Sequence, residues 1–103
     1  ADESLISNLD SYLPKELLQN KKYQLKKVVI PNNDIWIRDY GPFFMEKNES
    51  DKKKKLLLDF DFNAWGGKFP PWDLDNKVPK QMSLYLGEEM ESYPIIMEGG
   101  SLE

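Results

Sequence analysis

The alternation of strand-like apolar runs with helical repeats constrains the fold of this chain more than any other feature of its sequence. Four short runs are rich in β-branched, leucine or aromatic residues and are bounded by turn-forming residues, a pattern typical of strands. They span residues 27–30, 43–46, 56–62 and 94–97. One helical repeat precedes the first run, and another separates the last two. The order α, β, β, β, α, β predicts an α/β fold in which two helices accompany a mixed sheet.

The helical repeats have recognisable ends. The first repeat has Asp2 or Ser4 available as an N-cap, and Pro14 interrupts it before a second short turn. Its apolar stripe consists of Leu5, Ile6, Leu9 and Leu13. The second helix is predicted from about Lys77 to Leu86. Its expected cap is Asn76, its expected end is Gly87, and Pro79 is tolerated in its first turn. The apolar stripe of this second helix, Val78, Met82, Tyr85 and Leu86, predicts a helix that packs on the sheet.

Size and charge exclude several functions. A chain of 103 residues has room for one core, and a net charge of −4 argues against a broad electrostatic grip on nucleic acid. The basic run Lys52–Lys55 is framed by acidic residues, so we interpret 48–55 as a polar, solvated hairpin loop rather than a binding patch. No apolar stretch approaches the roughly 20 residues of a membrane span. We expect no membrane or nucleic-acid partner.

The chain contains no cysteine and no histidine. It therefore has no disulfide, no thiol nucleophile, and neither the usual metal ligand nor the usual neutral-pH base. We expect no metal and no cofactor, and the composition is compatible with the cytoplasm. The chain does not begin with Met, and its last residues, Leu102-Glu103, are compatible with a cloning remnant. The expectation is an N-terminal or internal piece of a longer protein.

A dense polar cluster lies between the first two predicted strands, from Asn33 to Pro42. The cluster is compatible with a regular strand, which would point Trp36 and Asp39 to opposite faces. It is equally compatible with a helical turn, which would place them on one side because they are three residues apart. A carboxylate beside an aromatic face suits a planar cation such as guanidinium, which donates parallel N–H bonds and stacks on the ring. The alternative is structural: Asp39 caps a turn or pairs with Arg38, and Trp36 fills the core.

Two further segments combine polar or aromatic residues with glycines. In the stretch 63–73, Trp65 is either a wall of a substrate loop or one of several aromatics tucked under a tight connection. Glu98 follows the last predicted strand and precedes two glycines, and a carboxylate in that setting is often simply solvated.

Together these segments resemble successive motifs of the agmatine deiminase and bacterial peptidylarginine deiminase family, within the guanidine-modifying (pentein) superfamily. The resemblance covers roughly residues 28 to 101. Its motifs are Asp34-x-Trp36-x-Arg38-Asp39-x-Gly41-Pro42, Phe62-Asn63-Ala64-Trp65-Gly66-Gly67-Lys68, Asp73-x-Asp75 before Val78-Pro79, and Glu98-Gly99-Gly100-Ser101. The resemblance implies part of a five-fold α/β propeller, of which residues 1–103 would supply about two sheet-plus-helix units as a single fragment.

The resemblance also implies roles for individual residues. Asp39 would bind the substrate guanidinium, Trp36 would line the same pocket, and Trp65 would be a further wall. Glu98 would orient the catalytic histidine or contribute to guanidinium binding. Arg38 would hold the loop carboxylates in place, and Asp34 would cap a turn or support the site from behind. The family's Cys and His lie downstream of these motifs, so this chain alone is expected not to turn over substrate.

Three functions remain open from the sequence. The first is part of an agmatine deiminase, which hydrolyses agmatine to N-carbamoylputrescine and ammonia in putrescine biosynthesis, or of a related peptidylarginine deiminase. The parent is a candidate homo-oligomer whose partner is a small guanidinium substrate. The second is a non-catalytic module that binds a cation or a protein through Trp36, Asp39 and Trp65. The third is a structural α/β domain with these aromatics in its core. As an isolated chain, it is expected either to fold as a subdomain or to associate through its sheet edges.

Overall fold

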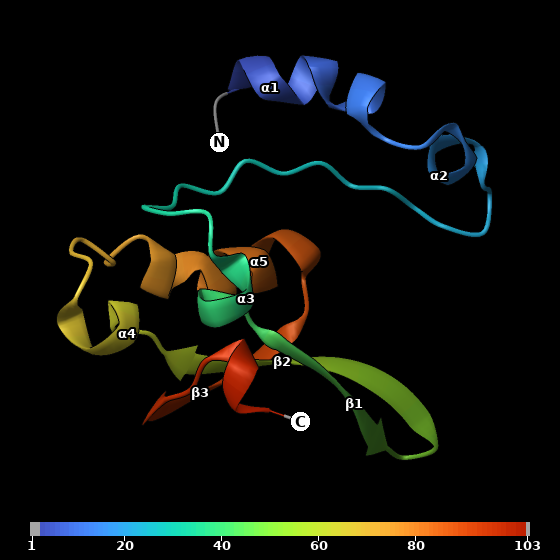
Figure 1. Cartoon of the computed structure of the whole chain (residues 1–103). Helices are drawn as coiled ribbons and strands as arrows, with labels where there is room; N and C mark the ends of the chain where they lie inside the picture. Colours follow the sequence, from blue (N-terminus) through green and yellow to red (C-terminus); the bar gives the residue numbers. More distant parts are fainter. Residues whose placement is uncertain (1–2, 103) are drawn as a thin grey trace. The chain divides into compact units, whose positions relative to one another are not determined.

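The computed structural model describes residues 3–102 and divides the chain into two compact units, Ala1–Ile30 and Pro31–Glu103 (Figure 1). The first unit contains α1 (Glu3–Asn8), the 3₁₀ turn η1 (Leu9–Tyr12) and α2 (Lys15–Gln19). The predicted break is confirmed: Pro14 separates η1 from α2, and its carbonyl oxygen accepts bonds from the next turn. Ser4 lies inside α1 and is not its cap, while Asp2 lies outside the described residues.

The strand predicted over residues 27–30 is wrong. The described residues form one sheet, in the order β1-β2-β3, and this stretch belongs to none of its strands. β-branched residues favour an extended backbone, but a strand also needs a partner whose N–H and C=O groups complete the ladder. The apolar character of this run therefore predicted the conformational preference and not the pairing.

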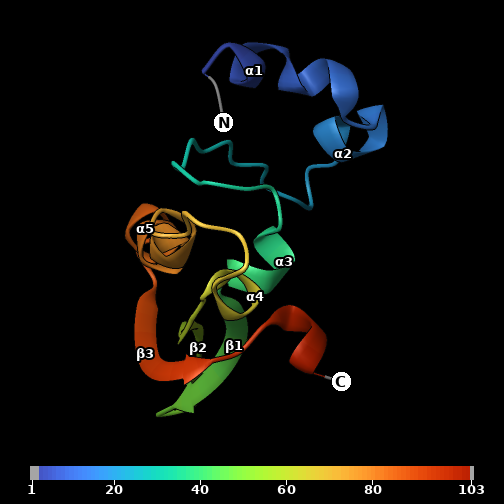
Figure 2. The ribbon, with the colours of Figure 1, turned by 60° about the vertical axis from the view of Figure 1, so that its left-hand side comes forward.

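The second unit is built on a mixed sheet. Strands β1 (Phe43–Glu49) and β2 (Lys52–Asp61) are antiparallel, and β3 (Glu89–Ile96) pairs parallel to β2. The connection from β2 to β3 contains the turn α4 (Ala64–Gly67), the 3₁₀ turn η2 (Asp75–Lys77) and α5 (Val78–Leu86). Helix α5 contacts both β2 and β3, as Figures 1 and 2 show. The predicted α/β class with a mixed sheet is confirmed.

The β1–β2 hairpin is tighter than predicted. Only Ser50 and Asp51 lie between the strands, with φ angles of 50° and 65°, so the polar loop expected over 48–55 is wrong. Two positive φ angles match the twist of a two-residue hairpin turn. The lysine run lies in β2, where Lys53 and Lys54 form exposed ion pairs with glutamates of β1 at 3.3 and 3.2 Å. The charges are thus solvated on a strand.

The core lies where β2 meets α3 (Ile37–Tyr40), α4 and α5. Its buried apolar side chains are Tyr40, Leu56, Leu57, Phe62, Ala64 and Val78. The last predicted helix is confirmed to within one residue, and it ends before Gly87 as expected. Its predicted cap is wrong, because Asn76 Oδ1 accepts the Phe62 N–H at 2.9 Å and the helix begins after Lys77. Asn76 therefore ties η2 to the end of the central strand.

Candidate functional site

One edge of the sheet gathers the polar segments. Strands β2 and β3 are parallel, so their carboxyl ends meet there, and the antiparallel β1 begins at the same edge. Helix α3 immediately precedes β1, α4 follows β2, and the 3₁₀ turn η3 (Gly99–Ser101) follows β3. The topology therefore brings together three segments that are distant in sequence, at the edge where α/β sheets commonly bind ligands.

The α3 segment forms a helical turn and not a strand, which decides between the two conformations that the sequence left open. Trp36 precedes the turn, and its carbonyl oxygen accepts the Asp39 N–H at 2.9 Å. Trp36 is 53 % exposed, so it is not the core residue of the structural alternative. Among residues 3–102, Arg38 forms no ion pair with Asp39 or with any other carboxylate. The prediction that Arg38 holds the carboxylates of this loop in place is therefore wrong. Asp39 instead accepts a hydrogen bond from another segment.

A reciprocal clamp fixes the chain just before α3. Asp75 Oδ1 accepts the Asn33 and Asp34 N–H groups at 2.6 and 3.2 Å. Asn33 Oδ1 accepts the Leu74 and Asp75 N–H groups at 2.8 and 3.1 Å. Asp75 is only 2 % exposed, so these bonds satisfy a buried carboxylate. The clamp joins two segments about forty residues apart and holds the Asp34–Trp36 loop against η2.

Tyr40 secures the same loop from the other side. Its hydroxyl donates to the Asp34 carbonyl oxygen at 2.6 Å, and its ring is buried against Phe62. Burial, followed by the nearby charges of Asp75 and Asp34, raises the pKa of Tyr40 above its usual value. The hydroxyl therefore remains a donor throughout the neutral range.

The turn α4 aims Trp65 at α3. All four of its residues have positive φ, including Ala64 at 52° and Trp65 at 58°. A left-handed conformation costs roughly 1–2 kcal/mol for each residue with a side chain. The Asn63 side chain accepts the Gly66 N–H at 2.9 Å and its carbonyl accepts the Gly67 N–H at 2.7 Å, which offsets part of that cost. Strain of this kind is typical of functional positions.

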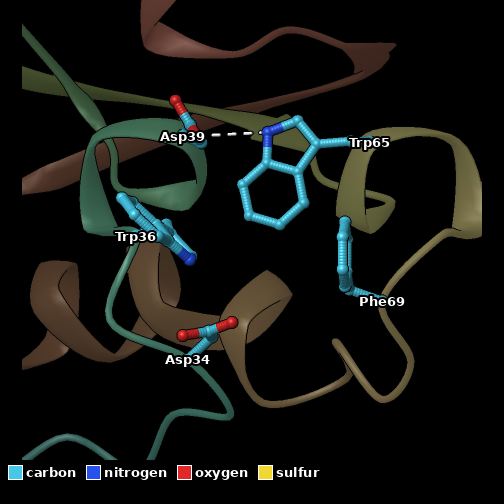
Figure 3. A pocket seen from close by; sticks show the side chains of 5 residues that line it. All are labelled: Asp34, Trp36, Asp39, Trp65 and Phe69. Carbon is cyan, nitrogen blue, oxygen red and sulfur yellow. Dashed lines mark hydrogen bonds between the residues drawn. The ribbon is translucent and has the colours of Figure 1, made fainter.

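The result is a pocket of about 410 Å³, lined by aromatic and acidic side chains. Its lining residues are Asp34, Trp36, Asp39, Trp65 and Phe69 (Figure 3). The Trp65 indole N–H donates to Asp39 Oδ2 at 3.2 Å. The Trp65 ring lies edge to face with Trp36 and Phe69, at centroid distances of 6.4 and 5.6 Å. Aromatic walls around carboxylates suit an organic cation.

Glu98 lies at the same edge but does not line this pocket. It is half-buried two residues after β3 ends, and its carbonyl oxygen accepts the Ser101 N–H at 2.9 Å. The following Gly99 packs directly on α3, where an added Cβ would collide with the Arg38 carbonyl oxygen. The glycine therefore lets the Glu98 segment approach the turn that carries Asp39.

The structure thus brings three of the four predicted site residues, Trp36, Asp39 and Trp65, into one pocket. It places Glu98 outside the lining, just before the turn η3 that contacts α3. Their roles toward a substrate stay predictions. Sequence reasoning missed Phe69 as a wall and treated Asp34 only as a turn cap or supporting residue. Asp34 does form the turn, accepting the Ile35 N–H at 2.7 Å, but it also lines the pocket. The spacing did not indicate this, because side chains two or five residues apart do not share a face of a helical turn.

Among residues 3–102, no three His, Cys, Asp or Glu side chains are grouped so as to hold a metal ion. No helix in the same range has the length and apolar character needed to cross a membrane.

Comparison with known proteins agrees with the motifs. The Porphyromonas-type peptidyl-arginine deiminase family matches residues 4–103. A Shewanella baltica protein named "Putative agmatine deiminase" is 36% identical over 98 residues, which cover 87% of this chain and 26% of the relative.

Solved structures agree as well. An agmatine deiminase from C. jejuni, determined with substrate bound, is 32% identical with a TM-score of 0.70, covering 99% of this chain and 26% of that one. The agmatine deiminase of Enterococcus faecalis is 28% identical with a TM-score of 0.71, covering 97% and 26%. This chain therefore spans about a quarter of the length of these relatives. It belongs to the Porphyromonas-type peptidyl-arginine deiminase family.

Proposed function

We propose that this chain supplies the guanidinium-binding part of an agmatine deiminase, which hydrolyses agmatine to N-carbamoylputrescine and ammonia. The observation that carries the proposal is the pocket that Asp39, Trp36 and Trp65 line together, in which the Trp65 indole N–H donates to Asp39. The names of the matched relatives support agmatine as the substrate. The proposal extends to a cytoplasmic, homo-oligomeric parent that acts in putrescine biosynthesis, as the family resemblance implies.

The pocket suits a guanidinium for three physical reasons. A carboxylate accepts two parallel N–H bonds from the planar cation, which a spherical ammonium does not offer. The indole of Trp36 provides a π face for the delocalised plane, worth about 0.5–2 kcal/mol depending on desolvation. The Trp65 N–H engages Asp39 Oδ2 and so fixes the rotation of the carboxylate before the ligand arrives.

The reaction itself needs groups that these 103 residues do not contain. In deimination a thiolate attacks the guanidinium carbon and ammonia departs, leaving an amidino-thioether that water hydrolyses to the ureido product. A histidine protonates the ammonia and then activates the water. Since the sequence has neither Cys nor His, we propose that the chain by itself binds but does not turn over substrate. Glu98, at the sheet edge beside α3, is proposed to orient that histidine in the parent.

Peptidyl-arginine is the second candidate substrate, because the matched family is described by that activity. Both substrates present the same guanidinium to Asp39 and differ in the group at the far end of the alkyl chain. Activity of the full-length parent on agmatine and on a peptide with C-terminal arginine separates the two. Turnover of neither substrate would refute the deiminase proposal.

Calorimetric titration tests the binding function on the chain itself. We expect agmatine to bind the wild-type chain, and Asp39→Asn to abolish binding by removing the charge while keeping the shape of the side chain. Asp51→Asn is the matched control: it removes the same charge at the hairpin turn, where asparagine tolerates the positive φ of 65°. Equal affinities for the two variants would contradict the assignment of Asp39.

A further inference from the structure

Asp34 is the one charged residue of the pocket lining to which the proposed function gives no role. Figure 3 shows its carboxylate below the Trp36 ring and that of Asp39 above it. Three bonds hold its backbone and side chain: its N–H donates to Asp75, its carbonyl accepts from Tyr40, and its Oδ1 accepts from Ile35. A carboxylate has about four lone-pair positions, so one bond to Ile35 leaves it able to accept others. Asp34 is therefore a fixed acceptor at the pocket wall.

The pocket lining carries two negative charges, whereas one guanidinium carries a single positive charge. Two carboxylates line it, and the other three lining residues are aromatic, so no basic side chain in the lining compensates them. A monocation bound at Asp39 would leave the solvent-exposed carboxylate of Asp34, which lines the same pocket, without a positive group of the ligand to face it. Electrostatic complementarity therefore favours an occupant with two positive groups joined by a spacer.

We propose that Asp34 binds the ammonium group at the far end of a guanidino-alkylamine whose guanidinium lies at Asp39, an inference that rests on the proposed function. The exposed ring faces of Trp36 and Phe69 offer apolar surface for the alkyl spacer. Asp34 is then the specificity-determining residue of the pocket. It attracts a free amine and disfavours an arginine at a peptide C-terminus, whose far end carries a carboxylate.

A pair of matched ligands tests this role. Agmatine and n-butylguanidine share the guanidinium and the alkyl chain, and only agmatine has the amine. By calorimetry at low ionic strength, we expect agmatine to bind the wild-type chain about fivefold tighter, the upper end for an exposed ion pair. Asp34→Asn should reduce agmatine affinity to that of n-butylguanidine and leave n-butylguanidine unchanged. The asparagine Oδ1 can still accept the Ile35 N–H, so the turn is preserved.

The outcomes separate the inference from the proposed function. If both ligands bind the wild-type chain equally, or Asp34→Asn weakens both by the same factor, the ammonium role of Asp34 is overturned while the guanidinium site stands. If n-butylguanidine does not bind, the guanidinium site itself fails. An unchanged amide spectrum of Asp34→Asn outside residues 33–40 excludes a loss of fold as the cause.

Discussion

Removing the Asn33–Asp75 clamp should destabilise the second unit by an amount that its hydrogen bonds predict. In Asp75→Ala, the Asn33 and Asp34 N–H groups lose a charged acceptor. Bonds to charged groups contribute about 1.5–3 kcal/mol each, so a loss near 3 kcal/mol is expected, at the lower end because the site is only part-buried. A unit of this size is typically stable by roughly 4–11 kcal/mol, so the variant should still fold.

Two milder variants grade the effect. Asn33→Ala removes a neutral acceptor of two backbone bonds and should cost about 2 kcal/mol. Asp75→Asn keeps an acceptor oxygen and loses only the charge, so about 1 kcal/mol is expected. Urea unfolding followed by tryptophan fluorescence measures all three, with a midpoint shift of about 1 M for each 1 kcal/mol.

The order of the three variants is the decisive result. A loss below about 1 kcal/mol for Asp75→Ala, or equal losses for Asp75→Ala and Asp75→Asn, would refute the view that this buried carboxylate holds the loop. Guanidinium binding by Asp75→Ala, measured under conditions where it is folded, should also be weaker, because the loop leading to Trp36 is no longer fixed.

Three further changes test other parts of the fold. Tyr40→Phe should cost about 1 kcal/mol at pH 7 in a thermal melt. Because the pKa of Tyr40 is raised in the folded state, wild-type stability should also fall as pH rises above about 10, and Tyr40→Phe should lack that part of the fall. The same alkaline stability profile for both proteins would contradict a raised pKa of Tyr40. Desolvation raises the pKa of Asp59 above its usual value, so its contribution to stability is present at acid pH and lost as pH rises. Asp59→Asn should therefore stabilise the chain at pH 7. A destabilised variant would contradict the unfavourable desolvation of the Asp59 carboxylate. Replacing Ser50-Asp51 with Asn-Gly, which suits two positive φ angles, should raise the free energy of unfolding by about 1 kcal/mol in urea. An unchanged free energy of unfolding would contradict the two-residue turn.

The features that sequence predicted well are local. The three-residue spacing of Trp36 and Asp39 needs only one helical turn to place both on one side, and α3 supplies that turn. Likewise, Pro14 and Gly87 mark helix boundaries through their own backbone restrictions. Short-range geometry of this kind is determined by the residues concerned and requires no knowledge of the rest of the chain.

The features that sequence missed depend on distant partners. Nothing near Asp75 indicates that its carboxylate binds a loop about forty residues earlier. Phe69 lines the pocket in contact with the Trp65 ring, and the left-handed backbone of Ala64 and Trp65 is not indicated by the glycines that follow them. The hairpin turn at Ser50-Asp51 lacks the usual Asn-Gly signal, so its tightness was hidden as well.

The three tryptophans offer the most direct test of the central claim, that Asp39 binds a guanidinium in the pocket that Trp36 and Trp65 line. Their indole N–H groups give separate NMR signals, and Trp72 lies outside the pocket lining as an internal control. On titration with agmatine, we expect the Trp36 and Trp65 signals to shift along one saturating curve, with Trp65 shifting most because its N–H already donates to Asp39. The Trp72 signal should stay in place. Unchanged Trp36 and Trp65 signals at millimolar agmatine, or equal shifts of all three, would contradict the account.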